Sequence, residues 1–173
     1  MLKSLCVASV LLATSLNVFA ERVITPPPYK DMQGKRLSSV ECLAINSYME
    51  GRGESDMANI MIMSTVLNRV NDRRWPSSIC GVVFQKGQYS WTGDKLSDKV
   101  HDSVQYIRLY RLAEHFLINK DTFLKLSGGA NHYHSTKVHP YWVGSERMEY
   151  VSSLDGHKFY YWKDKPQYLN LIK

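Results

Sequence analysis

Apolar residues recur at helical spacing through the first half of the chain, which predicts a helical body. Ser38 and Glu41 match a capping box, so a helix is expected to begin there and to end near Gly51. A second helix is expected over about 55–70, capped by Ser55 or Asp56, and its apolar middle is almost uninterrupted. Such a pattern is typical of a central, buried helix.

Two more helices are expected before residue 120. The segment 75–78, Trp-Pro-Ser-Ser, is expected to interrupt helical structure, and a short helix is expected to follow over about 79–84. A long helix follows over about 98–118, with a buried side formed by Val100, Val104, Ile107, Leu112, Ala113 and Phe116. Between these two helices, residues 87–91 are expected to form an exposed loop or edge segment.

After Gly128 the pattern changes to the shorter period of strands. Two such stretches, 148–154 and 157–162, flank Asp155 and Gly156, a dipeptide that strongly favours a two-residue hairpin turn. The sequence therefore predicts an α+β domain, mainly helical, with a small C-terminal β-hairpin.

The two ends of this domain differ in character. Residues 1–20 combine a basic start at Lys3, an apolar stretch and a small-x-small exit, which predicts a signal peptide cleaved before Glu21. The apolar stretch is shorter than the roughly 20 residues of a membrane span, so no stable span is expected after cleavage. Residues 21–37 are expected to form an extended, Pro-rich lead-in, and 38–173 the globular domain. An exported protein of the periplasm, the extracellular space or the cell wall is expected.

Composition and charge narrow the class of partner. The 173 residues are 44% hydrophobic and 22% charged, typical of one globular domain, and we expect a monomer. The formal net charge is +6, or +5 without Lys3, and the basic residues are scattered rather than clustered. This pattern favours an anionic cell wall over nucleic acid. In an exported chain, Cys42 and Cys80 form one pair, which predicts a disulfide, with two buried free thiols as the alternative.

The densest polar cluster, residues 48–54, lies between the first two helices. Glu50 is expected at the C-terminal end of a helix beside apolar residues, and both surroundings would raise its pKa toward that of a general acid. Glu54 precedes the second helix and is expected to be a cap or a partner of Arg52. A solvated helix end is the alternative for Glu50.

Histidine and aromatic residues form two further candidate groups. His132, His134, His139 and His157 invite a zinc hypothesis, but no helical H-E-x-x-H pair is present, so no metal and no cofactor are expected. Gln88, Tyr89, Ser90 and Trp91 combine flat apolar rings with hydrogen-bonding groups, a mixture that suits a sugar. Ordinary core packing of the two aromatic residues is the alternative.

Taken in order, these blocks resemble the spore-cortex-lytic, SleB-type cell-wall hydrolase family over about residues 37–161. The resemblance rests on the following segments of the chain: 42–44, 48–54, 66–70, 75–76, 80–85, 87–91, 129–130, 132–134, 140–142 and 156–160. It implies a lysozyme-like fold related to lytic transglycosylases, and cleavage of peptidoglycan glycan strands. Gly51 departs from the alanine or serine usual at its place in the family's motif.

The resemblance also implies roles for particular residues. Glu50 would be the catalytic acid, supported by Arg52 and Glu54, and the reaction would break the bond between N-acetylmuramic acid and N-acetylglucosamine to give a 1,6-anhydro end. The glycan cleft would be lined by Tyr48, Gln88, Tyr89, Ser90, Trp91, Tyr133 and His134. The alternatives are a hydrolytic muramidase, a metallopeptidase or amidase that acts on the stem peptides, and a non-catalytic glycan-binding protein.

Overall fold

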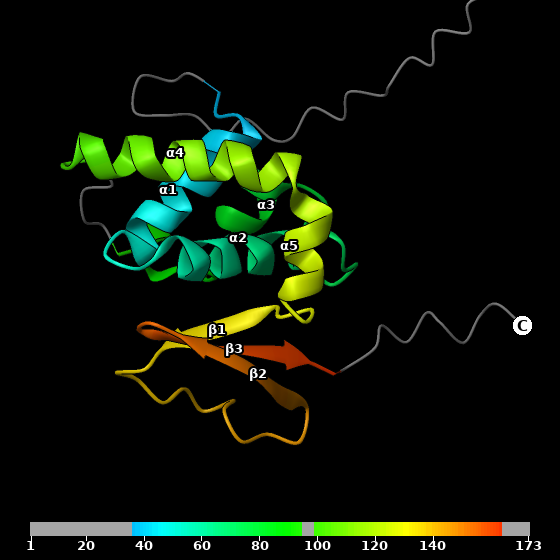
Figure 1. Ribbon diagram of the computed structural model, residues 1–173. Helices are drawn as coiled ribbons and strands as arrows, with labels where there is room; N and C mark the ends of the chain where they lie inside the picture. Colours follow the sequence, from blue (N-terminus) through cyan, green and yellow to red (C-terminus); the bar gives the residue numbers. More distant parts are fainter. Residues whose placement is uncertain (1–35, 95–98, 164–173) are drawn as a thin grey trace, which may run out of the picture.

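The computed structural model describes residues 36–94 and 99–163, which form a layer of helices above a small antiparallel sheet (Figure 1). In chain order the elements are α1 (Ser39–Gly51), α2 (Asp56–Val70), α3 (Ile79–Val83), the 3-10 helix η1 (Ser90–Thr92), α4 (Ser103–Ile118), α5 (Lys120–Leu126), β1 (His132–Ser135), β2 (Met148–Leu154) and β3 (His157–Trp162). The predicted α+β class is confirmed. The predicted signal peptide and all but the last two residues of the Pro-rich lead-in lie outside the described residues.

Local signals fix where the first two helices begin. The capping box is present, with Glu41 N–H donating to Ser38 Oγ and Ser38 N–H donating to the Glu41 carboxylate at 2.7 Å. Ser55 caps α2. The middle of α2 is buried on all sides, as its sequence predicts, because α1, α3, α4, α5 and β1 all pack around it.

The long helix α4 differs from its prediction in the face that it buries. Leu109, Ala113 and Phe116 are fully buried, but Val104 is 74% exposed, and Val100 and Ile107 are also exposed. Residues 104 and 107 lie away from the stripe formed by positions 109, 113 and 116, so they do not reach α1. The prediction for these three residues was therefore wrong.

The sheet has the order β1-β3-β2, with both pairs antiparallel. The predicted hairpin is present as β2 and β3, and Asp155 in its turn has a φ of 47°. The sequence did not indicate that residues 132–135 would add an edge strand beside β3. The sheet meets α2 because Phe159 of β3 and Ala130, which precedes β1, pack against Met61 and Ile62.

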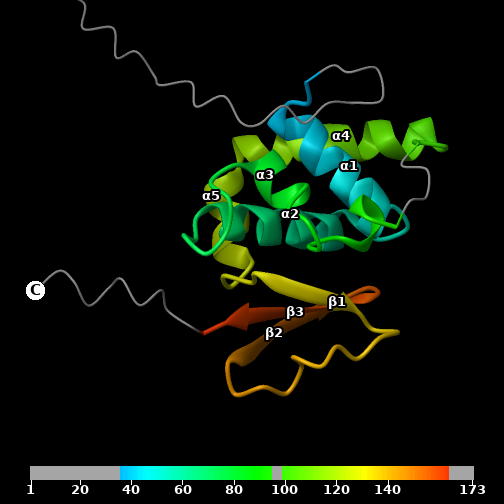
Figure 2. The same ribbon diagram turned by 180° about the vertical axis from the view of Figure 1, so that it is seen from behind.

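Cys42 and Cys80 form a disulfide, with their Cα atoms 5.3 Å apart, so the predicted bridge is confirmed. It joins α1 to α3, which lie together when the molecule is seen from behind (Figure 2). Among the described residues, no helix is both long and apolar enough to cross a membrane.

Candidate active site

Glu50 is the penultimate residue of α1 and lies where the helical layer faces the sheet. Burial raises the pKa of its carboxyl group above the ordinary value, while a hydrogen bond from Tyr133 and the charge of Arg69 lower it in part. The direction of the predicted shift is therefore confirmed, with burial as its main cause. A raised pKa suits a general acid, because a larger share of its carboxyl groups then carries a proton to donate.

The phenol of Tyr133 connects the edge strand to this carboxylate. Its hydroxyl donates to Glu50 Oε2 at 3.2 Å, and its ring packs between Tyr89, His157 and Phe159. Burial raises the pKa of Tyr133 well above its ordinary value, so the phenol stays protonated and remains a hydrogen-bond donor. Tyr133 is thus a fixed donor aimed at Glu50.

Arg69, near the end of α2, brings a buried positive charge to the same place. It is 6% exposed, and its Nε–H donates to the backbone carbonyl of Asn131 at 2.7 Å. Its guanidinium lies 5.8 Å from the ring centres of both Tyr89 and Trp75, and its Nη1 has no hydrogen-bond partner. The charge is therefore held rigidly and favours the ionised form of Glu50.

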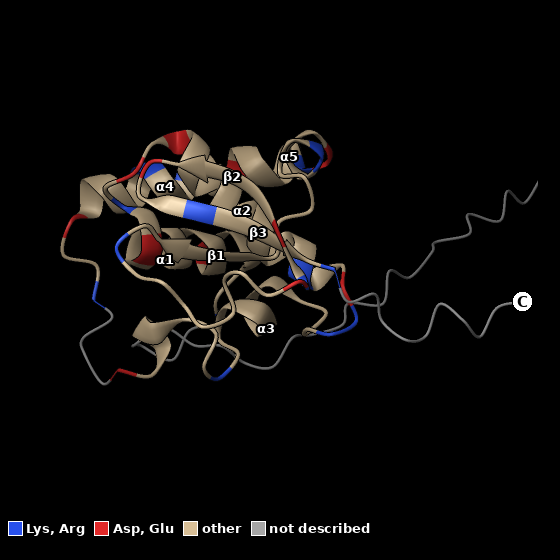
Figure 3. Cartoon of the chain, turned by 90° about the horizontal axis from the view of Figure 1, so that it is seen from below, with Lys and Arg blue, Asp and Glu red and all other residues tan. Residues whose placement is uncertain are grey.

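These groups line a cavity of about 200 Å³, which we call the Glu50 pocket. Its lining residues are Glu50, Arg69, Gln88, Tyr89, Ser90 and Tyr133. The structure thus brings together four of the residues predicted to bind substrate and the predicted acid, and adds Arg69. Seen from the side of the sheet, acidic and basic residues are scattered over helices, strands and loops (Figure 3).

Trp91 does not line this pocket. It is 8% exposed, its ring packs against Phe84, and its Nε1–H donates to Asn46 Oδ1 at 3.4 Å. Tyr89 is also buried, at 5% exposure, so the expectation of an exposed loop over 87–91 was wrong for its two aromatic residues. Both rings belong to the hydrophobic core, and only Tyr89 also borders the pocket.

Two other predicted site residues have structural partners instead. Tyr48 is 2% exposed, and its hydroxyl accepts the backbone N–H groups of His101 and Asp102 at 3.1 and 3.0 Å, which fixes the start of α4. The guanidinium of Arg52 lies over the Tyr48 ring, 5.2 Å from its centre. Tyr48 is therefore a core residue rather than part of the cleft.

Contrary to its prediction, Glu54 is neither a helix cap nor a partner of Arg52. Its carboxylate accepts the backbone N–H of Gly156 at 3.1 Å, in the turn of the β2–β3 hairpin. Next to it, Ser55 N–H donates to Asp155 Oδ2 at 2.7 Å. These two bonds, which we call the hairpin clamp, tie the turn between α1 and α2 to the sheet. His157 lies against the same carboxylate, with its Nδ1 3.9 Å from Glu54 Oε1.

His134 was predicted to line the cleft beside Tyr133, but it points to the other face of the sheet. Adjacent residues of a strand alternate between faces, so His134 stacks on Tyr160, and its Nε2 lies 3.2 Å from the Tyr160 hydroxyl. His132 and His134 both contact Trp142 on this outer face. Across the part of the chain that the structure describes, no three His, Cys, Asp or Glu side chains are grouped to hold a metal ion.

The glycine at position 51 has a packing reason. A Cβ atom there would lie 2.8 Å from both Asn59 Oδ1 and Ile62 Cδ1, and the Gly51 carbonyl accepts Asn59 Nδ2–H at 2.8 Å. Glycine thus allows the end of α1 to approach α2 closely, immediately after Glu50.

Sequence reasoning missed the role of Arg69 in the pocket. The available signal was that Arg69 is expected near the end of a helix that is itself expected to be buried. A buried arginine requires specific partners for its charge, so its position indicates a specific role. What the sequence could not indicate is that Asn131 and Tyr89, far away in the chain, would provide them.

Comparison with known proteins identifies a sequence family and solved structures with a similar fold. The sequence model of a family described as Cell Wall Hydrolase matches residues 53–160. No curated protein matches the chain by sequence. Glu50 lies just before the matched region, so its assignment depends on the geometry described above.

Two solved structures share the fold. The catalytic domain of the Bacillus cereus SleB protein is 16% identical with a TM-score of 0.52, and the alignment covers 77% of this chain and 93% of that domain. The catalytic domain of the germination-specific lytic transglycosylase SleB from Bacillus anthracis is 18% identical with a TM-score of 0.53, covering 78% and 98%. Because the family model covers more than half of the chain, the protein belongs to the cell wall hydrolase family.

Proposed function

We propose that this protein cleaves the glycan strands of peptidoglycan between N-acetylmuramic acid and N-acetylglucosamine, as a lytic transglycosylase that uses Glu50 as its acid and base. The observation that carries the proposal is a half-buried carboxyl group with a raised pKa, held by Tyr133 in a pocket that also contains Arg69. Membership of the cell wall hydrolase family supports peptidoglycan as the substrate. The shared fold of the Bacillus anthracis protein, a germination-specific lytic transglycosylase, supports the type of reaction.

The reaction needs one group that first donates a proton and then removes one. Protonated Glu50 donates its proton to the glycosidic oxygen while the bond from that oxygen to C1 of the muramoyl residue breaks. The resulting carboxylate takes the proton of the muramoyl C6 hydroxyl as O6 bonds to C1. Glu50 is protonated again, and the product ends in a 1,6-anhydro ring. The attacking hydroxyl is tethered to the reacting sugar, so it competes well with water.

The other residues of the pocket serve this cycle. Tyr133 and Arg69 stabilise the carboxylate that forms after the first proton transfer, and so keep the pKa of Glu50 from rising further. Gln88 and Ser90 offer an amide and a hydroxyl to the substrate at the mouth of the pocket. Arg52 and Glu54 support Glu50 from outside the pocket through α1 and the hairpin clamp.

One observation favours this mechanism over a hydrolytic muramidase. Glu50 is the only carboxylate among the described residues that line the pocket, whereas a hydrolase of this kind uses two facing carboxylates. The carboxylate of Glu54 is engaged by the Gly156 N–H. A substrate in the cell wall also implies that the protein acts outside the cytoplasm.

Digestion of purified peptidoglycan tests the proposal. Wild-type protein and a Glu114→Gln control, altered at an exposed residue of α4, should release soluble muropeptides at equal rates. Glu50→Gln should be slower by about 100-fold or more, because an amide cannot donate and reclaim the proton. A chelator should change neither rate. Full activity of Glu50→Gln, or loss of activity in the chelator, would contradict the proposal.

A further inference from the structure

The sheet carries a second hollow, on the face turned away from α2. Its volume is about 370 Å³, within the range of small-ligand pockets, and it shares no lining residue with the Glu50 pocket. We call it the Trp142 pocket; it is lined chiefly by His132, Tyr141, Trp142, Ser145, Arg147 and Trp162. His132 lies next to Tyr133 on β1, and their side chains point to opposite faces of the strand. The two pockets therefore lie on opposite faces of the sheet.

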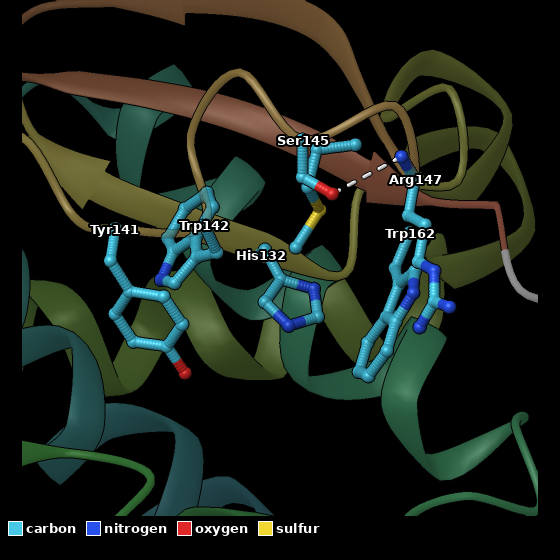
Figure 4. Close-up of a pocket in the computed structure, with 7 residues that line it drawn as sticks. His132, Tyr141, Trp142, Ser145, Arg147 and Trp162 are labelled. Carbon is cyan, nitrogen blue, oxygen red and sulfur yellow. Dashed lines mark hydrogen bonds between the residues drawn. The ribbon is translucent and has the colours of Figure 1, made fainter.

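Two indoles flank an imidazole in this pocket. The ring centres of Trp142 and Trp162 lie 5.6 and 5.5 Å from that of His132, and their planes are inclined to it by 64° and 73°. Figure 4 shows His132 between them, so the indoles form two walls and the imidazole lies at the floor. Arg74, which does not line the pocket, stacks on Trp162 at 5.0 Å and is held by Asp72. The Trp162 wall is thus fixed before any ligand binds.

The floor offers one hydrogen-bond acceptor. His132 Nδ1 lies 2.8 Å from Asn131 Oδ1, and this oxygen also accepts the backbone N–H of Trp162 at 2.9 Å. Because the amide oxygen can only accept, the imidazole proton is on Nδ1, and Nε2 keeps a lone pair. Burial and the charges of Arg69 and Arg74 lower the pKa of His132 to about 4, so the ring is neutral at physiological pH.

The rim of the pocket combines an exposed ring with a positive charge. Tyr141 is 98% exposed, and its ring lies on the Trp142 side of the opening (Figure 4). On the other side, the segment of Arg147 is held by its backbone N–H, which donates to Ser145 Oγ at 3.3 Å. An exposed large aromatic residue beside a formed pocket is typical of a binding surface.

We propose that the Trp142 pocket binds an N-acetylated pyranose ring of the wall glycan, at a site separate from the point of cleavage. The apolar face of such a ring packs on the flat indoles, and a sugar hydroxyl or acetamido N–H donates to His132 Nε2. The choice of ligand rests on the proposed function, whereas the form of the pocket does not. A glycan strand bound in the Trp142 pocket would stay near the enzyme, since its binding to the Glu50 pocket then becomes an intramolecular step.

The indole N–H signals of the four tryptophans in a nitrogen-15 NMR spectrum test this directly. The protein is Glu50→Gln, which should not cleave the probe, tetra-N-acetylchitotetraose. The signals of Trp142 and Trp162 should shift on titration. Trp142→Ala and Tyr141→Ala should each weaken the affinity read at Trp162, by up to about tenfold for the loss of one ring contact. Tyr150→Ala, an exposed aromatic residue of β2 that does not line the pocket, should leave the affinity unchanged.

Two results would overturn the inference. One is that the Trp142 and Trp162 signals stay fixed while the probe binds elsewhere on the protein. The other is that a synthetic stem tetrapeptide shifts these signals and the sugar does not, which would make the pocket a peptide site. Failure of the proposed function would be seen separately, as full cleavage activity of Glu50→Gln, and would leave the indole measurement intact.

Discussion

The hydroxyl of Tyr133 donates a hydrogen bond to the carboxylate of Glu50 across 83 residues of sequence, at 3.2 Å. Glu50 lies in the last turn of α1 and Tyr133 on the edge strand of the sheet, so this bond joins the two layers at the pocket. It also stabilises the ionised form of Glu50 against the effect of burial.

Removal of this bond should change how activity depends on pH. Tyr133→Phe keeps the ring but not the donor, so the pKa of Glu50 should rise further. The general acid must be protonated, so kcat/KM falls as pH rises through this pKa, and that alkaline limb should move to higher pH in the variant. Tyr150→Phe is the control, because Tyr150 lies outside the Glu50 pocket. An unmoved limb, or one moved to lower pH, would contradict the role given to Tyr133.

Glu50→Gln should be more stable than the wild type at pH 8. The pKa of Glu50 is raised in the folded state, so the protonated form favours folding, and this contribution is lost as pH rises from the ordinary value of 4.5 through the folded value. Glutamine has no charge to lose. Thermal midpoints of the two proteins should differ at pH 8 and converge at pH 4. Equal midpoints at pH 8 would mean that burial of Glu50 is not costly.

Reduction of the disulfide should destabilise the fold. The bridge between Cys42 and Cys80 spans a sequence separation of 38 residues, and a native bridge in a small secreted domain stabilises by about 2–5 kcal/mol. The measurement is chemical unfolding with and without a reductant, on protein that lacks residues 1–20. Two reactive thiols in the unfolded, unreduced protein would contradict the bridge.

The hairpin clamp predicts different effects for two glycine substitutions. A Cβ at Gly156 would lie 2.6 Å from Glu54 Oε1, so Gly156→Ala must displace this carboxylate, and the loss of its hydrogen bond with the Gly156 N–H should cost about 1 kcal/mol. Gly53→Ala is the matched control, because a Cβ there meets nothing within 4 Å. Denaturant unfolding compares the free energies of unfolding of the two variants.

Glu54→Gln keeps an acceptor oxygen for the Gly156 N–H and should lose less activity than Glu50→Gln. A larger loss in Glu54→Gln would contradict the assignment of Glu50 as the acid and Glu54 as its support.

Features with local causes were predictable from the sequence. The capping box at Ser38 depends on residues three positions apart, and the turn at Asp155 and Gly156 depends on two neighbours. The position of Glu50 at a helix end follows from the same kind of signal, and the change in its pKa was predicted in direction.

Features set by distant partners were not predictable. Trp91 is a core residue because its ring packs against Phe84 and its indole N–H donates to Asn46. Nothing within residues 87–91 indicates these contacts. The clamp between Glu54 and Gly156 joins residues 102 positions apart. Likewise, the apolar residues of α4 fit more than one helical face, and the positions of the helices packed against it, chiefly α1 and α2, decide that Leu109 is buried and Val104 exposed.

Mass spectrometry of the muropeptides released from purified peptidoglycan tests the central claim most directly, because it identifies the broken bond and the new end group together. Wild-type protein is predicted to give 1,6-anhydromuramoyl ends, and Glu50→Gln to give none, since the tethered C6 hydroxyl attacks only when Glu50 exchanges protons with it. Products with only reducing muramic acid ends, or with cut stem peptides and intact glycan strands, would contradict the account.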